Sequence, residues 1–85
     1  MTEEQIEQML KEYIVQEFLY DEPEVVLTNE LKIIEQGIVD SLDLFNLVRF
    51  IEEEVGIFWE PHELVQKNFE TIGRIKSVVL EKLAS

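Results

Sequence analysis

A serine flanked by two aspartates is the feature of this 85-residue chain that most clearly suggests chemistry. Asp40 is of a type favoured at a helix N-cap, and Asp43 lies three residues later, where its side chain can reach back. Ser41 would then lie in a first helical turn, beside backbone N–H groups that lack an intrahelical partner and favour negative charge. A phosphate ester on Ser41 would be stabilised there. The alternative is an ordinary polar residue in a first turn.

The composition predicts one small helical domain over residues 1–85. Hydrophobic residues make up 46% of the chain, too many for a disordered tail, and only 3 glycines and 2 prolines are available for turns. The chain has no cysteine, which excludes disulfides and thiolate metal sites, so any thiol chemistry must come from a cofactor. We find no secretory signal or membrane span in the sequence and expect a soluble, cytoplasmic monomer.

The chain is strongly acidic. Its 19 acidic and 7 basic residues give a formal net charge of -12 at pH 7. Such a charge repels nucleic acid and anionic lipid head groups, so neither is an expected partner. It attracts basic surfaces on other proteins, although solubility alone would also account for it.

A first helix and a long connection precede the serine. Thr2 and Gln5 form a capping-box pattern, and the helix is predicted to end near Leu19 or Tyr20. Its apolar stripe contains Ile6, Met9, Leu10, Tyr13, Ile14 and Phe18. Pro23 interrupts the pattern, so a connection over residues 21–39 follows. Its expected anchors in the core are Val25, Val26, Leu27, Leu31, Ile33, Ile34 and Ile38.

The second helix is predicted over residues 41–55, after a turn at Gly37 and before a terminating Gly56. Its core stripe contains Leu44, Leu47, Val48, Ile51 and Val55. Leu42, Phe45 and Arg49 fall on another face. That face either packs inside a helix buried on two sides or docks partner proteins.

The C-terminal part predicts one short and one longer helix. Pro61 suits the start of a short helix over residues 62–66, and Thr71 is a candidate N-cap for the last helix. In the last helix Ile72, Ile75, Val78, Val79 and Leu83 recur at helical spacing, and Phe69 is expected to pack back onto the bundle. The predicted fold is therefore all-α, a small four-helix bundle of three longer helices and one short helix, with a long loop between helices one and two.

The sequence does not provide a catalytic or metal site. No nucleophile has a plausible histidine base, and the lone His62 is expected at the surface. Acidic runs such as residues 52–54 belong to solvated helix faces, and no segment has the ligand order of an EF-hand. We expect neither an enzyme nor a specific metal site.

Three segments of the chain resemble the acyl and peptidyl carrier protein family. They are residues 31–42 (LKIIEQGIVDSL), 50–57 (FIEEEVGI) and 68–72 (NFETI), and the likeness covers essentially the whole chain. The resemblance implies that a phosphopantetheinyl transferase attaches 4′-phosphopantetheine to Ser41, using coenzyme A and a divalent metal. The thiol of that arm would carry an acyl or aminoacyl group as a thioester.

The resemblance also implies how other proteins recognise the chain. Asp40 and Asp43 would help the transferase recognise the site. The face read by partners would comprise Leu42, Phe45, Asn46, Arg49, Glu52 and Glu53. The implied partners, besides the transferase, are an acyl- or aminoacyl-loading ligase and downstream synthase or transferase enzymes.

Two departures from the pattern of fatty-acid carriers bear on the pathway. Asn46 stands where many of those carriers have an acid, and Arg49 where an apolar residue is usual. Gly37 is also one residue further from Ser41 than in the usual Gly-Ala-Asp-Ser-Leu motif. The two residues argue against the partner set of general fatty-acid synthesis, and the longer spacing is similar to that of free-standing carriers in specialised-metabolite or aminoacyl-transfer chemistry.

Two alternatives from other functional classes stay open at this point. An unmodified helical adaptor would bind a partner protein through Leu42 and Phe45, and replacing Ser41 would leave its function intact. A small acidic cation sensor would change its spectrum or stability when calcium binds.

Overall fold

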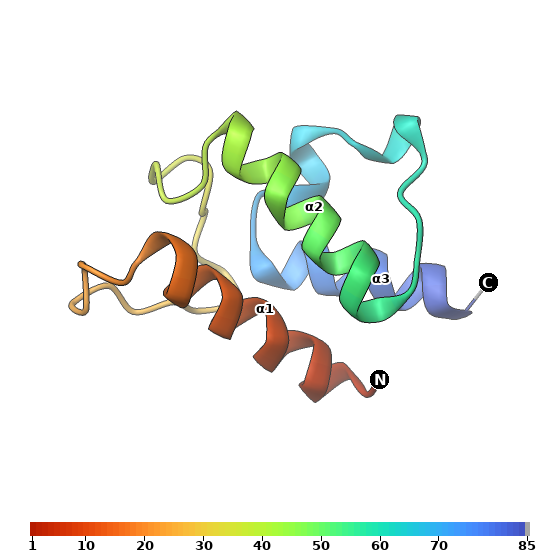
Figure 1. Ribbon diagram of the computed structural model, residues 1–85, viewed down its shortest axis with the longest axis horizontal. Helices are drawn as coiled ribbons and strands as arrows, with labels where there is room; N and C mark the ends of the chain where they lie inside the picture. Colours follow the sequence, from red (N-terminus) through yellow and green to blue (C-terminus); the bar gives the residue numbers. More distant parts are fainter. Residues whose placement is uncertain (85) are drawn as a thin grey trace.

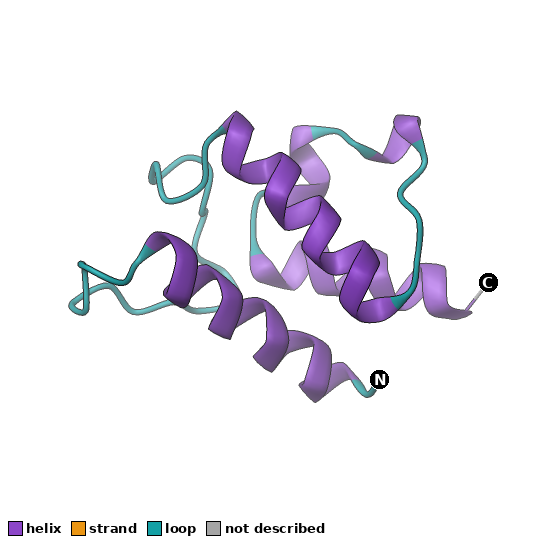
Figure 2. Ribbon diagram, in the orientation of Figure 1, coloured by secondary structure: helices purple, strands orange, loops and turns teal. Residues whose placement is uncertain are grey.

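The computed structural model describes residues 1–84, which contain three α-helices, two short 3-10 helices and no β-strand. The α-helices are α1 (Glu3–Phe18), α2 (Ser41–Val55) and α3 (Ile72–Ala84), and the 3-10 helices are η1 (Pro61–Glu63) and η2 (Gln66–Phe69). Figure 1 shows α1 and α2 running in opposite directions, with α3 behind α2. The two longer loops of the described chain lie before and after α2 (Figure 2). The predicted all-helical class is confirmed.

α1 begins at the predicted capping box. The Gln5 N–H donates to Thr2 Oγ1 (3.2 Å), and the Thr2 N–H donates to Gln5 Oε1 (2.8 Å). The helix ends at Phe18, one residue before the earlier predicted end, and the Leu19 N–H caps it by donating to the Val15 carbonyl (3.1 Å). Its fully buried residues are Ile6, Leu10 and Ile14.

The short helix predicted over residues 62–66 is replaced by two 3-10 helices, so the fourth helix of the bundle is not a single element. η1 is closed by bonds from the Glu63 N–H to the Glu60 carbonyl (2.9 Å) and from the Leu64 N–H to the Pro61 carbonyl (3.2 Å). Val65 then has an extended backbone (φ -116°, ψ 147°) and separates η1 from η2. Such tight turns have poorer hydrogen-bond geometry than an α-helix and rarely extend beyond a few residues.

The helices bury their apolar faces in one core that contains no charged or polar residue within residues 1–84. α3 packs against α1 and η2. The core residues of α2 and α3 are Leu47, Ile51, Ile72, Ile75, Val78 and Val79. Residues outside the α-helices complete the core: Leu19, Ile33, Val39, Ile57, Trp59 and Phe69. Leu83, the last residue of the apolar repeat in α3, is 41% exposed, so the buried part of that repeat ends at Val79.

The long loop before α2 is fixed to the rest of the fold by three hydrogen bonds. The Ile33 N–H donates to the Glu70 carbonyl (3.0 Å), and the Gly73 N–H donates to the Asn29 carbonyl (3.0 Å). The Asn29 Nδ2 also donates to Glu7 Oε1 of α1 (2.6 Å). These bonds attach the loop to both α1 and the start of α3, so its course toward Ser41 is defined.

The residues that anchor this loop differ in part from the predicted set. Val26 is 76% exposed and therefore does not anchor the loop. Val39, which was not among the expected anchors, is only 1% exposed. Val39 directly precedes the N-cap of α2, so the loop is anchored immediately before the helix begins.

Candidate functional site

Ser41 is the first residue of α2, as the sequence predicts, and it is exposed. Within residues 1–84, no hydrogen bond or ion pair occupies its side-chain hydroxyl. The N–H groups of Ser41 and Leu42 precede the first bond of the helix, which the Leu44 N–H donates to the Asp40 carbonyl (2.9 Å). The hydroxyl therefore lies at the electropositive end of α2 and is open to solvent.

A reciprocal capping box fixes the backbone around Ser41. The Asp43 N–H donates to Asp40 Oδ1 (2.8 Å), and the Asp40 N–H donates to Asp43 Oδ2 (3.1 Å). Asp40 has an extended backbone (φ -97°, ψ -174°), so the chain turns sharply into the helix at Ser41. Each carboxylate thus stabilises the helix end through a backbone N–H that the helix itself leaves unpaired.

The turn that leads into the site depends on Gly37 and Ile33. Gly37 has a φ of 75°, a region that L-residues with side chains rarely adopt, and this confirms the predicted turn. The Ile38 and Val39 N–H groups both donate to the Ile33 carbonyl, at 2.9 and 3.1 Å. Because Val39 is buried directly afterwards, Asp40 and Ser41 emerge at the surface from a fixed point.

The outer face of α2 is exposed along its length. Leu42 is 75% exposed and Phe45 is 69% exposed, so the alternative of a helix buried on two sides is wrong for this face. Asn46, Arg49 and Glu53 are exposed on the same side of the helix. Arg49 Nη2 lies 3.7 Å from Glu53 Oε1, an exposed pair that contributes little to stability.

Glu52 and Asp43 are less exposed than the other residues assigned to the recognition face. Glu52 Oε2 accepts a hydrogen bond from the Trp59 N–H (3.0 Å), which ties the segment after α2 back to the helix. Asp43 is half-buried and lies near Tyr13 of α1. Burial raises the pKa of the Tyr13 hydroxyl, and the charges of Glu17 and Asp43 raise it further. Both carboxylates therefore interact with other parts of the fold.

A comparison with known proteins gives the family. The chain is 35% identical over 81 residues to an acyl carrier protein from Saccharopolyspora erythraea, and the match covers 95% of this chain and 77% of the relative. The chain belongs to the acyl carrier protein family. No protein-family model matches the chain.

Membership in the acyl carrier protein family implies a 4′-phosphopantetheine group, and the residues at the start of α2 fit it. The group needs a hydroxyl that an enzyme can reach, and the Ser41 hydroxyl is exposed and unbonded within the described chain. A phosphodiester there would face the free N–H groups of Ser41 and Leu42. The neighbouring carboxylates of Asp40 and Asp43 each accept a hydrogen bond from a backbone N–H, and neither is bonded to the Ser41 hydroxyl within the described chain.

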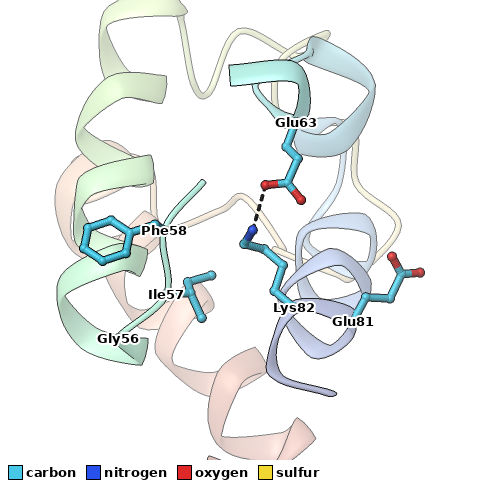
Figure 3. Close-up of a pocket in the computed structure, with 6 residues that line it drawn as sticks. All are labelled: Gly56, Ile57, Phe58, Glu63, Glu81 and Lys82. Atoms are coloured by element: carbon cyan, nitrogen blue, oxygen red, sulfur yellow. Dashed lines mark hydrogen bonds and ion pairs between the residues drawn. The ribbon is translucent and has the colours of Figure 1, made fainter. Parts of the chain in front are cut away.

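One hollow of this carrier-family protein is lined by residues of the segment that follows α2, of η1 and of α3 (Figure 3). It is lined by Gly56, Ile57, Phe58, Glu63, Glu81 and Lys82. Lys82 Nζ lies 2.7 Å from Glu63 Oε1, and this contact lowers the pKa of Glu63. Lys82 also lies 5.8 Å from the centre of the Trp59 ring. The ion pair and the ring contact hold the segment to α3.

The described residues contain neither a cluster of metal ligands nor a membrane-spanning helix. No three His, Cys, Asp or Glu side chains in residues 1–84 converge as metal ligands, and His62 is exposed as predicted. No helix in this range combines the length and apolar character needed to cross a bilayer.

Phe58 is a strongly exposed aromatic residue near α2, and the sequence pattern does not mark it as part of the recognition face. It is 80% exposed, although it lies between Ile57 at 9% and Trp59 at 7%. Figure 3 shows its ring on the opposite side of the segment from Glu63 and Lys82. The three consecutive apolar letters in the sequence do not reveal which one faces outward.

Proposed function

We propose that this protein carries acyl or aminoacyl groups as thioesters on a 4′-phosphopantetheine arm attached to Ser41. The proposal rests on one observation above all. This chain belongs to the acyl carrier protein family, and Ser41 is the first residue of α2. Its hydroxyl is exposed and makes no hydrogen bond within the described chain. When bound, the arm supplies the thiol that this cysteine-free chain lacks.

The attachment reaction requires only one nucleophile from this chain. The Ser41 oxygen would form a bond to the phosphorus that bears the pantetheine group of coenzyme A. The bond from that phosphorus to the nucleotide half would break, the nucleotide would leave with the electron pair, and the hydroxyl proton would pass to the transferase or solvent. The free N–H groups at the start of α2 would stabilise the charge of the phosphodiester.

The finer assignment concerns the type of carrier. We infer a single free-standing domain over residues 1–85 that works as a monomer in the cytoplasm. Asn46, Arg49 and the longer spacing from Gly37 to Ser41 favour specialised-metabolite or aminoacyl-transfer chemistry over general fatty-acid synthesis. Its partners would be the transferase, a loading ligase and downstream synthase or transferase enzymes, attracted by the net charge of -12.

Intact-protein mass spectrometry tests the proposal. The purified chain is incubated with coenzyme A, magnesium and a broad-specificity phosphopantetheinyl transferase, and we expect a mass increase of one phosphopantetheine group. Ser41→Ala should abolish the increase. Ser77→Ala changes a different exposed serine, which lies in α3, and should retain the increase. A folded wild-type protein that several such transferases leave unmodified would contradict the proposal.

The exposure of the outer face of α2 favours a second candidate function, an unmodified adaptor that binds a partner protein. Leu42 and Phe45 are exposed apolar side chains on one helix, which is the kind of surface that marks a protein contact. In that case Ser41→Ala would leave partner binding intact, and Phe45→Glu would abolish it. A carrier would lose function with either change, so the Ser41 variant separates the two.

A further inference from the structure

The exposed ring of Phe58 is held next to α2 by the packing of the two residues on either side of it. Its neighbours Ile57 and Trp59 are buried, so the backbone of this segment has one orientation and directs Phe58 outward. Trp59 packs on Phe69, with ring centres 5.0 Å apart, and Lys82 lies over its ring. An exposed aromatic side chain on a fixed backbone can enter an interface at a small entropic cost.

Glu52 connects this segment to the outer face of α2. Its Oε2 accepts the hydrogen bond from the Trp59 N–H (3.0 Å). Glu52 follows Phe45 by seven residues, which is two helical turns, so both lie along one side of α2. The bond therefore places the Phe58 segment on the side of α2 that bears Phe45.

We propose that Phe58 is part of the surface that docks the phosphopantetheinyl transferase, and that Glu52 positions Phe58 instead of contacting the enzyme. The inference rests on the proposed function of Ser41. An enzyme that modifies Ser41 must contact the start of α2, and the helix from Ser41 to Glu52 is about 17 Å long. A standard interface of about 800 Å² per partner is roughly 30 Å across and extends from Ser41 to this segment.

The charge and the polarity of this surface agree with a phosphopantetheinyl transferase as its partner. An enzyme that binds the phosphates of coenzyme A requires cationic groups around them, and this chain has a net charge of -12. Exposed apolar side chains surrounded by charge form the pattern of an interface centre with a polar rim. Leu42, Phe45 and Phe58 are such side chains, with Arg49 and Glu53 beside them on α2.

The steady-state kinetics of Ser41 modification test the proposal. The transferase is the enzyme, and the concentration of the carrier, its substrate, is varied. We expect Phe58→Ala to lower kcat/KM about five- to tenfold by raising KM, with kcat little changed. Val15→Ala, which truncates an exposed apolar residue of α1, is the control and should leave kcat/KM unchanged. Thermal unfolding of Phe58→Ala should match wild type, because the ring is exposed.

Two changes at Glu52 separate positioning from direct charge contact. Glu52→Gln keeps an oxygen that can accept the Trp59 N–H and should retain most of the wild-type kcat/KM. Glu52→Ala removes the acceptor and should resemble Phe58→Ala. An equal loss in both Glu52 variants would overturn the positioning role, because the negative charge would then be the property that the transferase reads.

Three further outcomes would each overturn a different part of the proposal. If wild type is modified and Phe58→Ala is as efficient as wild type, the docking role of Phe58 is wrong while the function of Ser41 stands. If wild type itself is never modified, the proposed function fails and this inference fails with it. If analytical ultracentrifugation shows a wild-type dimer that Phe58→Ala dissociates, the face binds a second copy of the chain and the transferase assignment is overturned.

Discussion

Asp40 and Asp43 each accept a hydrogen bond from the backbone N–H of the other, at 2.8 and 3.1 Å, and Ser41 lies between them. This reciprocal arrangement occupies both carboxylates with the end of the helix and leaves the serine hydroxyl unbonded within the described chain. The same two residues to which the family resemblance assigns transferase recognition therefore also build the turn that presents Ser41.

Removing the cap at Asp40 should destabilise the domain. Asp40→Ala removes the acceptor of the Asp43 N–H, and the loss of an N-cap side chain costs about 1 kcal/mol. Asp40→Asn keeps an acceptor oxygen and should lose clearly less. Urea unfolding followed by circular dichroism measures both variants, and an unchanged midpoint for Asp40→Ala would show that the cap does not support α2.

The carboxylate of Glu7 should make stability depend on pH in the acidic range. Glu7 Oε1 accepts hydrogen bonds from Asn29 Nδ2 (2.6 Å) and Lys76 Nζ (3.0 Å), and these lower the pKa of Glu7 from 4.5 to about 2. A pKa lowered by folding means that the charged form stabilises the native state. This stabilisation is present in full above pH 4.5 and is lost as the pH falls toward about 2.

A variant that lacks only the Glu7 charge separates the contribution of Glu7 to the pH dependence of stability from that of the other acidic residues. Glu7→Gln should be less stable than wild type at pH 7, and the difference in unfolding free energy should shrink as the pH falls from 4.5 to about 2. Glu24→Gln changes an exposed residue of the loop before α2 and should track wild type at every pH. A Glu7→Gln difference that stays constant with pH would contradict the account.

A higher ionic strength should raise the Tm of this domain. The formal charge of -12 on a chain of 85 residues produces self-repulsion that is strongest in the compact state. Added monovalent salt screens these charges over about 10 Å at 0.1 M, so Tm should rise between low salt and 0.1 M. Differential scanning calorimetry measures it, and a Tm that does not respond to salt would show that the acidic charges are too dispersed to matter.

The sequence was sufficient to predict α2 and the place of Ser41 at its start, because both depend on local signals. Asp40 and Gly56 mark the two ends of α2, and the structure has the helix over Ser41–Val55 as predicted. Gly56 has a φ of 81°, so it ends the helix in the left-handed conformation expected of a terminating glycine. The exposure of Ser41 follows from its place in the first turn.

The sequence was insufficient where the outcome depends on distant contacts. Three apolar residues in a row, Ile57 to Trp59, give no period, and the outward direction of Phe58 is set by the contacts of Trp59 with Glu52 and Phe69. The single short helix was predicted from Pro61, but a helix start does not determine how far a turn continues. Val26 is apolar yet exposed, and the loop is held by backbone bonds at Asn29 and Ile33 that the sequence does not reveal.

The central claim is that one hydroxyl at the start of α2 carries the arm. Fragmentation mass spectrometry of the protein treated with coenzyme A, magnesium and transferase locates the added group on the peptide chain. We predict phosphopantetheine on Ser41 alone, in a peptide that also contains Asp40 and Asp43. Attachment at any other residue, or a fully folded protein that gains no group, would contradict the account.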